Sequence, residues 1–453
     1  MTGSVERIAV EFAGDGAGED ALSWGQSENW STIVAIGNWF PLGGVKPLDP
    51  GTTVEDIAAE LSYLMGRYQP MRTRLRFDAD GRPRQLVSGS GQIDLEIVDA
   101  GDADPGAVAE ALSERYRTTD LDFTAEWPVR MGVVRHQGEP THLVVLMSHL
   151  AVDGTGALIM MSEVAAATDS PVPELQPLAQ ARWQQSAAGR RQNDAALRYH
   201  EGILRSVDPR RYQPQQPTDQ PRYWQGEFDS PAMLPAVQAI ADRTGLGSST
   251  VLLALFATSL AGITGIHPVV LRPIVGNRFR PGLSGVVCTL AQAGLCVLDV
   301  VGDSFDDVVQ QAQRSLMRAY KHGYFDPAAV ADLRERVAEE RGAAVDTACF
   351  FNDRRGAAQQ MDVGPDRQGA LSLDGAAPRP GTFRWVLSQD SPSLESLFLQ
   401  VDDVPDTVHL TFVMDSHCLS LADGQALVRG MESAALAAAA DPSGIAVGAV
   451  SDR

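Results

Sequence analysis

Cysteine and lysine are scarce in this sequence of 453 residues. Lysine occurs only at positions 46 and 321, and the four cysteines (Cys288, Cys296, Cys349 and Cys418) form no Cys-x-x-Cys pair. Three of these cysteines stand among apolar residues, where a reduced, buried thiol is the usual state. The pattern argues against a metal site such as zinc. It predicts a reducing, cytoplasmic location, since residues 1–20 also lack the features of a secretion signal.

Basic residues are too few for a nucleic-acid partner. The chain carries 37 Lys and Arg against 58 Asp and Glu, a formal charge of −21, and nucleic acids are bound by neutralising phosphates with basic side chains. An uncharged run at residues 244–266 has about the 20 residues of a membrane span. Its apolar residues recur at helical spacing, however, and Gly262, Gly265 and Pro268 interrupt it. We therefore expect a buried helix there and no membrane contact.

Two similar halves are expected along the chain. Strand patterns alternate with helical patterns, which predicts an α/β (α+β) fold with a sizeable sheet. The expected strands are 8–12, 85–98, 129–135, 142–147, 269–275, 294–300, 347–351, 394–401 and 407–414, and the expected helices are 53–68, 105–116, 248–260, 305–320 and 424–440. A proline-rich segment at 206–222 is the best linker candidate. It divides the chain into an N-terminal lobe, 1–205, and a C-terminal lobe, 223–453.

The segment Leu143–Gly156 carries the clearest chemistry. A strand pattern runs into Ser148-His149-x-x-x-Asp153-Gly154, and a helix pattern follows. A histidine where a strand ends and a glycine-containing turn begins has one ring nitrogen free for acid–base work near neutral pH. The nearby glycines let backbone N–H groups approach a developing oxyanion. An isolated His-x-x-x-Asp-Gly would serve equally well as a plain turn brace. Met414-Asp-Ser-His417 is a weak echo, for which a pseudo-symmetric strand end is the simpler interpretation than a second catalytic histidine.

Several segments in order resemble the condensation domains of nonribosomal peptide synthetases, relatives of chloramphenicol acetyltransferase, whose core signature is His-His-x-x-x-Asp-Gly. The matching segments are Ser148–Gly154, Leu22–Trp30 (the opening motif), Pro70–Phe77, Ala181–Gln184 with Leu197–Tyr199, Gly276–Leu283, and Ala319–His322 with 326–333. They span roughly residues 20 to 435. The resemblance implies two chloramphenicol-acetyltransferase-like lobes in a V-shaped pseudo-dimer with a central tunnel.

The resemblance also implies roles for individual residues. His149 takes the proton of the attacking group or positions that group, and the Gly154 N–H contacts the oxyanion. Asp153 is structural and pairs with Arg278 of the second lobe, while Ser148 replaces the first histidine of the signature without removing the catalytic one. Asn352 matches a family position near the acceptor side, with a turn residue as the alternative. Gln292 is a second candidate for a substrate contact, in a segment where the family's Phe-Val-Asn-Thr pattern aligns only with a shift of one or two residues.

The implied activity is a free-standing condensation enzyme of natural-product biosynthesis. An amine or hydroxyl acceptor, free or carrier-bound, attacks an acyl or aminoacyl thioester on the phosphopantetheine arm of a carrier protein supplied in trans, and no cofactor is bound by the chain itself. One alternative is a non-catalytic docking module that recruits a carrier protein or tailoring enzyme, for which Ser148 is the support. Another is an acyltransferase that uses acyl-CoA. An arginine-rich stretch at 182–222 fits either an acidic carrier protein or a solvated helix face.

Overall fold

The computed structural model describes residues 5–166, 168, 170–212, 221–300, 304–355, 379–390 and 395–441. The chain divides into two compact units: unit 1 comprises residues 1–191 and 276–291, and unit 2 comprises 192–275 and 292–453. The predicted lobes differ from this division. The change from one unit to the next falls inside helix α6 (Ala187–Ser206), not at 206–222, and residues 276–291 group with the N-terminal unit. Residues 213–220 of the predicted linker lie outside the described residues.

Unit 1 is built on a five-stranded sheet of order β1-β6-β7-β8-β3 and a small sheet of order β2-β5-β4. Its elements are β1 (Val5–Ala13), β2 (Gly18–Ala21), α1 (Trp24–Ile36), β3 (Pro41–Pro47), α2 (Val54–Arg67), a 3-10 turn (Gln69–Arg72), β4 (Thr73–Phe77), β5 (Pro83–Val87), β6 (Ser90–Asp99), α3 (Pro105–Thr118), β7 (Val129–His136), β8 (Glu139–Ser148), α4 (Gly154–Ala165) and α5 (Pro177–Gln185).

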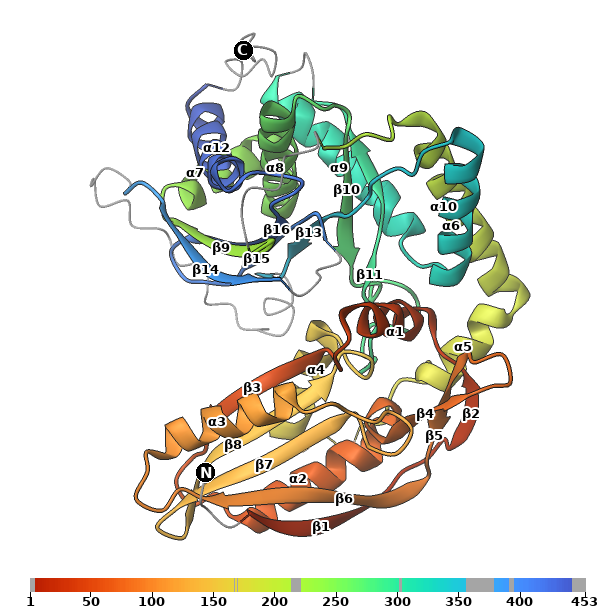
Figure 1. Ribbon diagram of the computed structural model, residues 1–453, viewed down its shortest axis with the longest axis vertical. Coiled ribbons are helices and arrows are strands. Elements are labelled where there is room, and N and C mark those ends of the chain that lie inside the picture. Colours follow the sequence, from red (N-terminus) through yellow and green to blue (C-terminus); the bar gives the residue numbers. More distant parts are fainter. Residues whose placement is uncertain are drawn as a thin grey trace. The chain divides into compact units, whose positions relative to one another are not determined.

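Helices cover both faces of the five-stranded sheet. Ile57 and Leu61 of α2 and Met160 of α4 belong to one apolar cluster with side chains of β1, β6, β7 and β8. Leu112 of α3 joins a second cluster with Val144 and other alternate strand residues. Because neighbouring side chains of a strand point to opposite faces, the two clusters lie on opposite sides of the sheet, as Figure 1 shows for α2 and α3.

The opening motif of the sequence forms the start of α1. Ser23 caps the helix and accepts a hydrogen bond from the backbone N–H of Gln26, whose side chain in turn accepts from the N–H of Ser23. This reciprocal cap satisfies two backbone donors that a helix start leaves open. The side chain of Gln184 in α5 accepts from the N–H of Trp24, so two of the recognised motifs contact each other.

Unit 2 contains an eight-stranded sheet of order β11-β10-β13-β15-β16-β9-β14, with β12 paired to β10. Its elements are β9 (Tyr223–Ser230), α7 (Met233–Thr244), α8 (Ser248–Thr264), β10 (Val269–Val275), β11 (Gln292–Ala293), β12 (Cys296–Leu298), α9 (Phe305–His322), α10 (Pro327–Arg341), β13 (Cys349–Asp353), β14 (Thr382–Gln389), β15 (Leu397–Asp402), β16 (Val408–Asp415) and α12 (Leu421–Ala440).

The uncharged run forms α8, as predicted, and every residue from Thr250 to Ala261 is buried. It packs in one large cluster with α7, α9, α12 and the inward side chains of the sheet. Of the helices described, none is alone both long and apolar enough to cross a bilayer, although α7 and α8 together, bent by 110°, meet a test of length and composition.

Candidate active site

The turn between β8 and α4 carries the predicted signature. Ser148 ends β8, which pairs with β7 on one side and β3 on the other. The N–H of His149 donates to the carbonyl of Phe40, just before β3. Asp153 then caps α4, and its Oδ1 accepts from the N–H of Gly156 at 2.7 Å. The histidine is therefore held between a sheet strand and a helix N-terminus.

Ser148 is fully buried, and its hydrogen bonds are to backbone groups. Its Oγ donates to the carbonyl of Trp39 at 2.9 Å and accepts from the N–H of Leu150 at 3.2 Å. Its own N–H donates to the carbonyl of Pro128. The Ser148 hydroxyl thus stabilises the backbone of the turn that carries His149.

Asp153 and Arg278 form a buried ion pair inside unit 1. The guanidinium lies 2.9 Å from Oδ2 through Nη1 and 2.8 Å from Oδ1 through Nη2. The backbone N–H groups of Leu290 and Ala291 also donate to Oδ2. Burial alone would raise the pKa of Asp153, but the Arg278 charge and these hydrogen bonds hold that pKa below its ordinary value.

The same arginine ties the segment 276–291 to the signature turn. Its Nη2 also donates to the carbonyls of Val286 and Cys288. Gly156 lies against this segment so closely that a Cβ would come within 2.9 Å of the Cys288 carbonyl. Gly156 is therefore a packing requirement that the sequence analysis did not single out, and the spacing Asp-Gly-x-Gly is the signal that could have found it. Its N–H bonds to Asp153, so it is not an oxyanion donor.

The imidazole of His149 is half-buried and stacks on Phe40, with ring centroids 4.7 Å apart and planes at 26°. Its Nδ1 is buried and has no hydrogen-bond partner among the described residues, which leaves Nε2 as the nitrogen for a substrate. Burial lowers the pKa of His149, although the Asp153 charge and the histidine's own backbone act in the opposite direction. The ring is consequently a neutral base at neutral pH.

Gly154 is the first residue of α4 and is exposed. A Cβ placed there meets nothing within 4 Å. The N–H groups of a first helical turn have no partner inside the helix, and they favour negative charge through the helix dipole. Gly154 therefore offers an open backbone donor five residues after His149, which fits the contact with an oxyanion that was predicted for it.

The two remaining predicted residues lie in unit 2. Gln292 is buried, and its amide bonds in both directions to the backbone of Phe325, at 3.0 and 3.3 Å. Gln292 thus braces the backbone of Phe325 through both atoms of its amide, and its predicted contact with substrate stays a prediction. Asn352 is half-buried in β13 opposite Gln400 of β15, so it belongs to a strand and not to a turn. Neighbouring Phe351 points into the core, so Asn352 faces the other side of the sheet.

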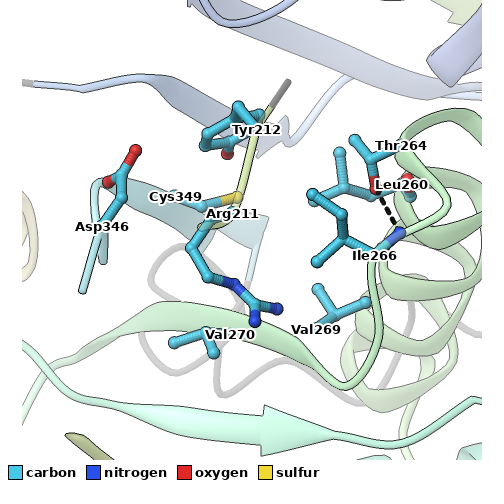
Figure 2. A pocket seen from close by; sticks show the side chains of 9 residues that line it. All are labelled: Arg211, Tyr212, Leu260, Thr264, Ile266, Val269, Val270, Asp346 and Cys349. Atoms are coloured by element: carbon cyan, nitrogen blue, oxygen red, sulfur yellow. Dashed lines mark hydrogen bonds between the residues drawn. The ribbon is translucent and has the colours of Figure 1, made fainter. Parts of the chain in front are cut away.

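Unit 2 also has a small pocket with a cavity of about 10 Å³. Figure 2 shows Arg211, Tyr212 and Cys349 around it. A cavity of this size holds about one water molecule, so it is too small for an acyl substrate. Burial raises the pKa of Cys349, and likewise of Cys288 and Cys296, to about 12, which keeps these thiols protonated. Among the described residues no group of His, Cys, Asp and Glu side chains could hold a metal ion.

Residues 48–368 match the family profile described as a condensation domain. This chain belongs to the condensation-domain family. Cyclosporin synthetase of Tolypocladium inflatum is 25% identical over 283 residues, which are 58% of this chain and 2% of the synthetase. This condensation domain thus spans only a small part of such relatives.

Solved structures share the fold of this condensation domain. One describes condensation domain-mediated chain release from the enacyloxin polyketide synthase, with a TM-score of 0.67, 18% identity, and coverage of 93% of this chain and 83% of the other. Another is the X-domain from teicoplanin biosynthesis, with a TM-score of 0.69, 15% identity, and coverage of 95% and 97%. The predicted α/β fold of the chloramphenicol-acetyltransferase type is confirmed.

Proposed function

We propose that this condensation domain forms an amide or ester bond from a thioester carried on the phosphopantetheine arm of a carrier protein. The amine or hydroxyl of an acceptor attacks the thioester carbonyl, and His149 Nε2 takes or orients its proton. The carbonyl oxygen becomes an oxyanion beside the Gly154 N–H. When the intermediate collapses, the C–S bond breaks and the new C–N or C–O bond remains. The sulfur leaves as a thiol with the proton that the acceptor lost, which His149 delivers in the version where it acts as the base.

One observation supports this proposal above the others: a neutral, half-buried imidazole and an open helix N-terminal N–H lie in the same short turn. Proton transfer from the nucleophile needs an unprotonated base, and the developing negative charge needs a fixed donor. The Asp153–Arg278 pair lies under this turn and fixes its shape. Relatives in the family include a nonribosomal peptide synthetase of Curvularia clavata and a bassianolide nonribosomal cyclodepsipeptide synthetase of Beauveria bassiana, so amide and ester products are both to be tested.

The direct test is turnover with a carrier protein loaded with an acyl or aminoacyl group and a pool of amines and alcohols. Mass spectrometry detects the released or transferred product. We expect product with the wild-type protein and about 10²- to 10⁴-fold slower product formation with His149→Ala of unchanged thermal stability. Equal product from both proteins would exclude the role of His149.

A docking function is the second candidate. The same fold occurs in a teicoplanin X-domain whose complex with OxyB has been solved, with a TM-score of 0.67 to this chain, and Ser148 departs from the His-His signature. Binding of a loaded carrier without any turnover would favour docking. Equal turnover with acyl-CoA in place of the loaded carrier would favour the acyl-CoA alternative.

A further inference from the structure

Phe40 has an unusual backbone conformation beside His149. Its φ is 51°, in the left-handed region that bulky residues rarely adopt. The side chain of Asn38 accepts from the Phe40 N–H at 2.8 Å, and the Phe40 carbonyl accepts from the N–H of His149 at 2.9 Å. Strain of this kind persists only where the surroundings enforce it, and it is concentrated at functional sites.

The Phe40 ring lies against the imidazole. The stacking distance is 4.7 Å at 26°, and the phenyl group also packs against an apolar cluster of Leu22, Ile33, Leu75 and Leu150. The two residues are placed by adjacent strands, since Pro41 of β3 pairs with Ser148 of β8, which lie side by side in Figure 1. The strained backbone therefore aims an anchored ring at one face of His149.

Within the described part of the chain, the stacking on Phe40 is the contact that bears most directly on the orientation of the imidazole. Catalytic histidines are commonly oriented by a hydrogen bond from the second ring nitrogen to a carboxylate or carbonyl. Here Nδ1 has no such bond to another described residue. Asp153 is the charged group of the described chain that acts on His149, and its oxygens are occupied by Arg278, Leu290, Ala291 and Gly156.

We propose that Phe40 is a positioning residue, whose ring fixes the plane of the His149 imidazole and shields one face of it from water so that Nε2 faces the acceptor. The proposal rests on the function proposed above. The proposal explains the left-handed conformation of Phe40, because a residue with an extended backbone at this position would point its side chain in another direction.

The variant Phe40→Gly separates the ring from the backbone. Glycine adopts a positive φ without strain, so the carbonyl that accepts from His149 stays in place while the ring is lost. We expect kcat to fall by about 10- to 100-fold, since misplacing a reacting group by about 1 Å can cost about 100-fold, with little change in the KM for the loaded carrier. The pKa of His149, followed by NMR, should rise because the ring is more hydrated.

Two further variants sharpen the comparison. Phe40→Tyr keeps an aromatic ring and should recover most of the activity and the low pKa. Gln137→Gly is the matched backbone control: Gln137 has a φ of 52° in the turn between β7 and β8, at the opposite end of β8 from His149. It should leave kcat and the pKa of His149 unchanged.

Phe40→Leu serves if the glycine variant does not fold, because it keeps apolar bulk but no flat ring. Wild-type kcat and an unchanged His149 pKa in whichever of the two variants folds would overturn the proposal for Phe40. The proposed function fails differently, through an active His149→Ala protein. An inactive His149→Ala with a fully active ring-deficient variant would leave the function standing and remove Phe40 from it.

Discussion

The turn after β8 in unit 1 and the turn after β16 in unit 2 follow the same local plan with different chemistry. Each strand is followed within two residues by a histidine and leads into a helix, α4 or α12. In unit 1 the helix cap is Asp153, which also pairs with Arg278. In unit 2 the cap is Ser420, and its backbone N–H is closed by Asp423 in a reciprocal cap.

The two turns also differ in which aspartate forms the ion pair and in what the histidine contacts. In unit 2 the ion pair involves the last strand residue, Asp415, with a half-exposed Arg222. The N–H of His417 donates to Asp415, whereas His149 stacks on an aromatic ring. The two turns therefore share a strand–turn–helix framework, and the turn that we propose to be reactive is the one in which the helix cap leaves an open N–H near the imidazole.

Removing each histidine should produce the largest contrast. His149→Ala is expected to lower turnover by about 10²- to 10⁴-fold, the range of general acid–base catalysis. His417→Ala should leave turnover unchanged because the unit 2 turn has no role in the proposed reaction. Product formation from loaded carrier measures both, and equal losses would abolish the distinction between the turns.

Removing each aspartate tests the two ion pairs. Asp153→Ala leaves Arg278 buried without its partner and should destabilise the protein by about 3–5 kcal/mol, so that misfolding dominates. Asp415→Ala should cost less, since Arg222 is 44% exposed and can be hydrated. Denaturant unfolding gives both free energies. A smaller loss for Asp153→Ala than for Asp415→Ala would contradict the ranking.

The backbone donor can be removed without changing the helix. Proline is well tolerated at the first position of a helix, and Asp153 already has the extended conformation that precedes a proline, with φ −93° and ψ 172°. Gly154→Pro should therefore fold but lose about 10²- to 10³-fold in kcat, the effect of one oxyanion donor. Gly154→Ala keeps the N–H and is the control for added bulk.

The smallest expected effect concerns His200, a buried histidine of unit 2 whose pKa is lowered. His200 of α6 is buried next to Phe325, and burial together with nearby cations lowers its pKa to about 3. Between about pH 6.5 and 3, His200 is protonated in the unfolded chain but not in the folded one. The free energy of unfolding therefore falls as the pH drops through this range, by up to about 1.4 kcal/mol per pH unit. His200→Phe should reduce this slope in unfolding experiments from pH 7 to 4. An unchanged slope would assign the pH dependence to other groups.

Periodic segments were predictable from the sequence, and irregular ones were not. The helices at α2, α3, α8 and α9 and the strands β1, β7, β8 and β10 lie where apolar periodicity places them. The expected strand 85–98 is instead two strands, β5 and β6. Strand β3 was missed because Pro41-Leu-Gly-Gly-Val-Lys-Pro47 has the composition of a loop. It lies at the edge of its sheet, where prolines are tolerated.

Site residues divide in the same way. Ser148, His149, Asp153 and Gly154 follow one another in a short motif, so the sequence alone could place them in one turn. Gln292 stands where the family pattern aligns only with a shift, and the tertiary structure is what shows its amide bonded to the backbone of Phe325. Phe40 carries no motif at all, and the asparagine two residues before it is the only local sign of its left-handed backbone.

The order of residues along the chain determined the family, the strand–histidine–turn–helix signature and the identity of the capping aspartate, because each of these depends on neighbours in sequence. Tertiary packing alone decided that residues 276–291 belong with unit 1, that position 156 has no room for a side chain, and that the Phe40 ring stacks on His149. These contacts join segments far apart in the chain, and they form only after the strands have paired and Asp153 has bound Arg278.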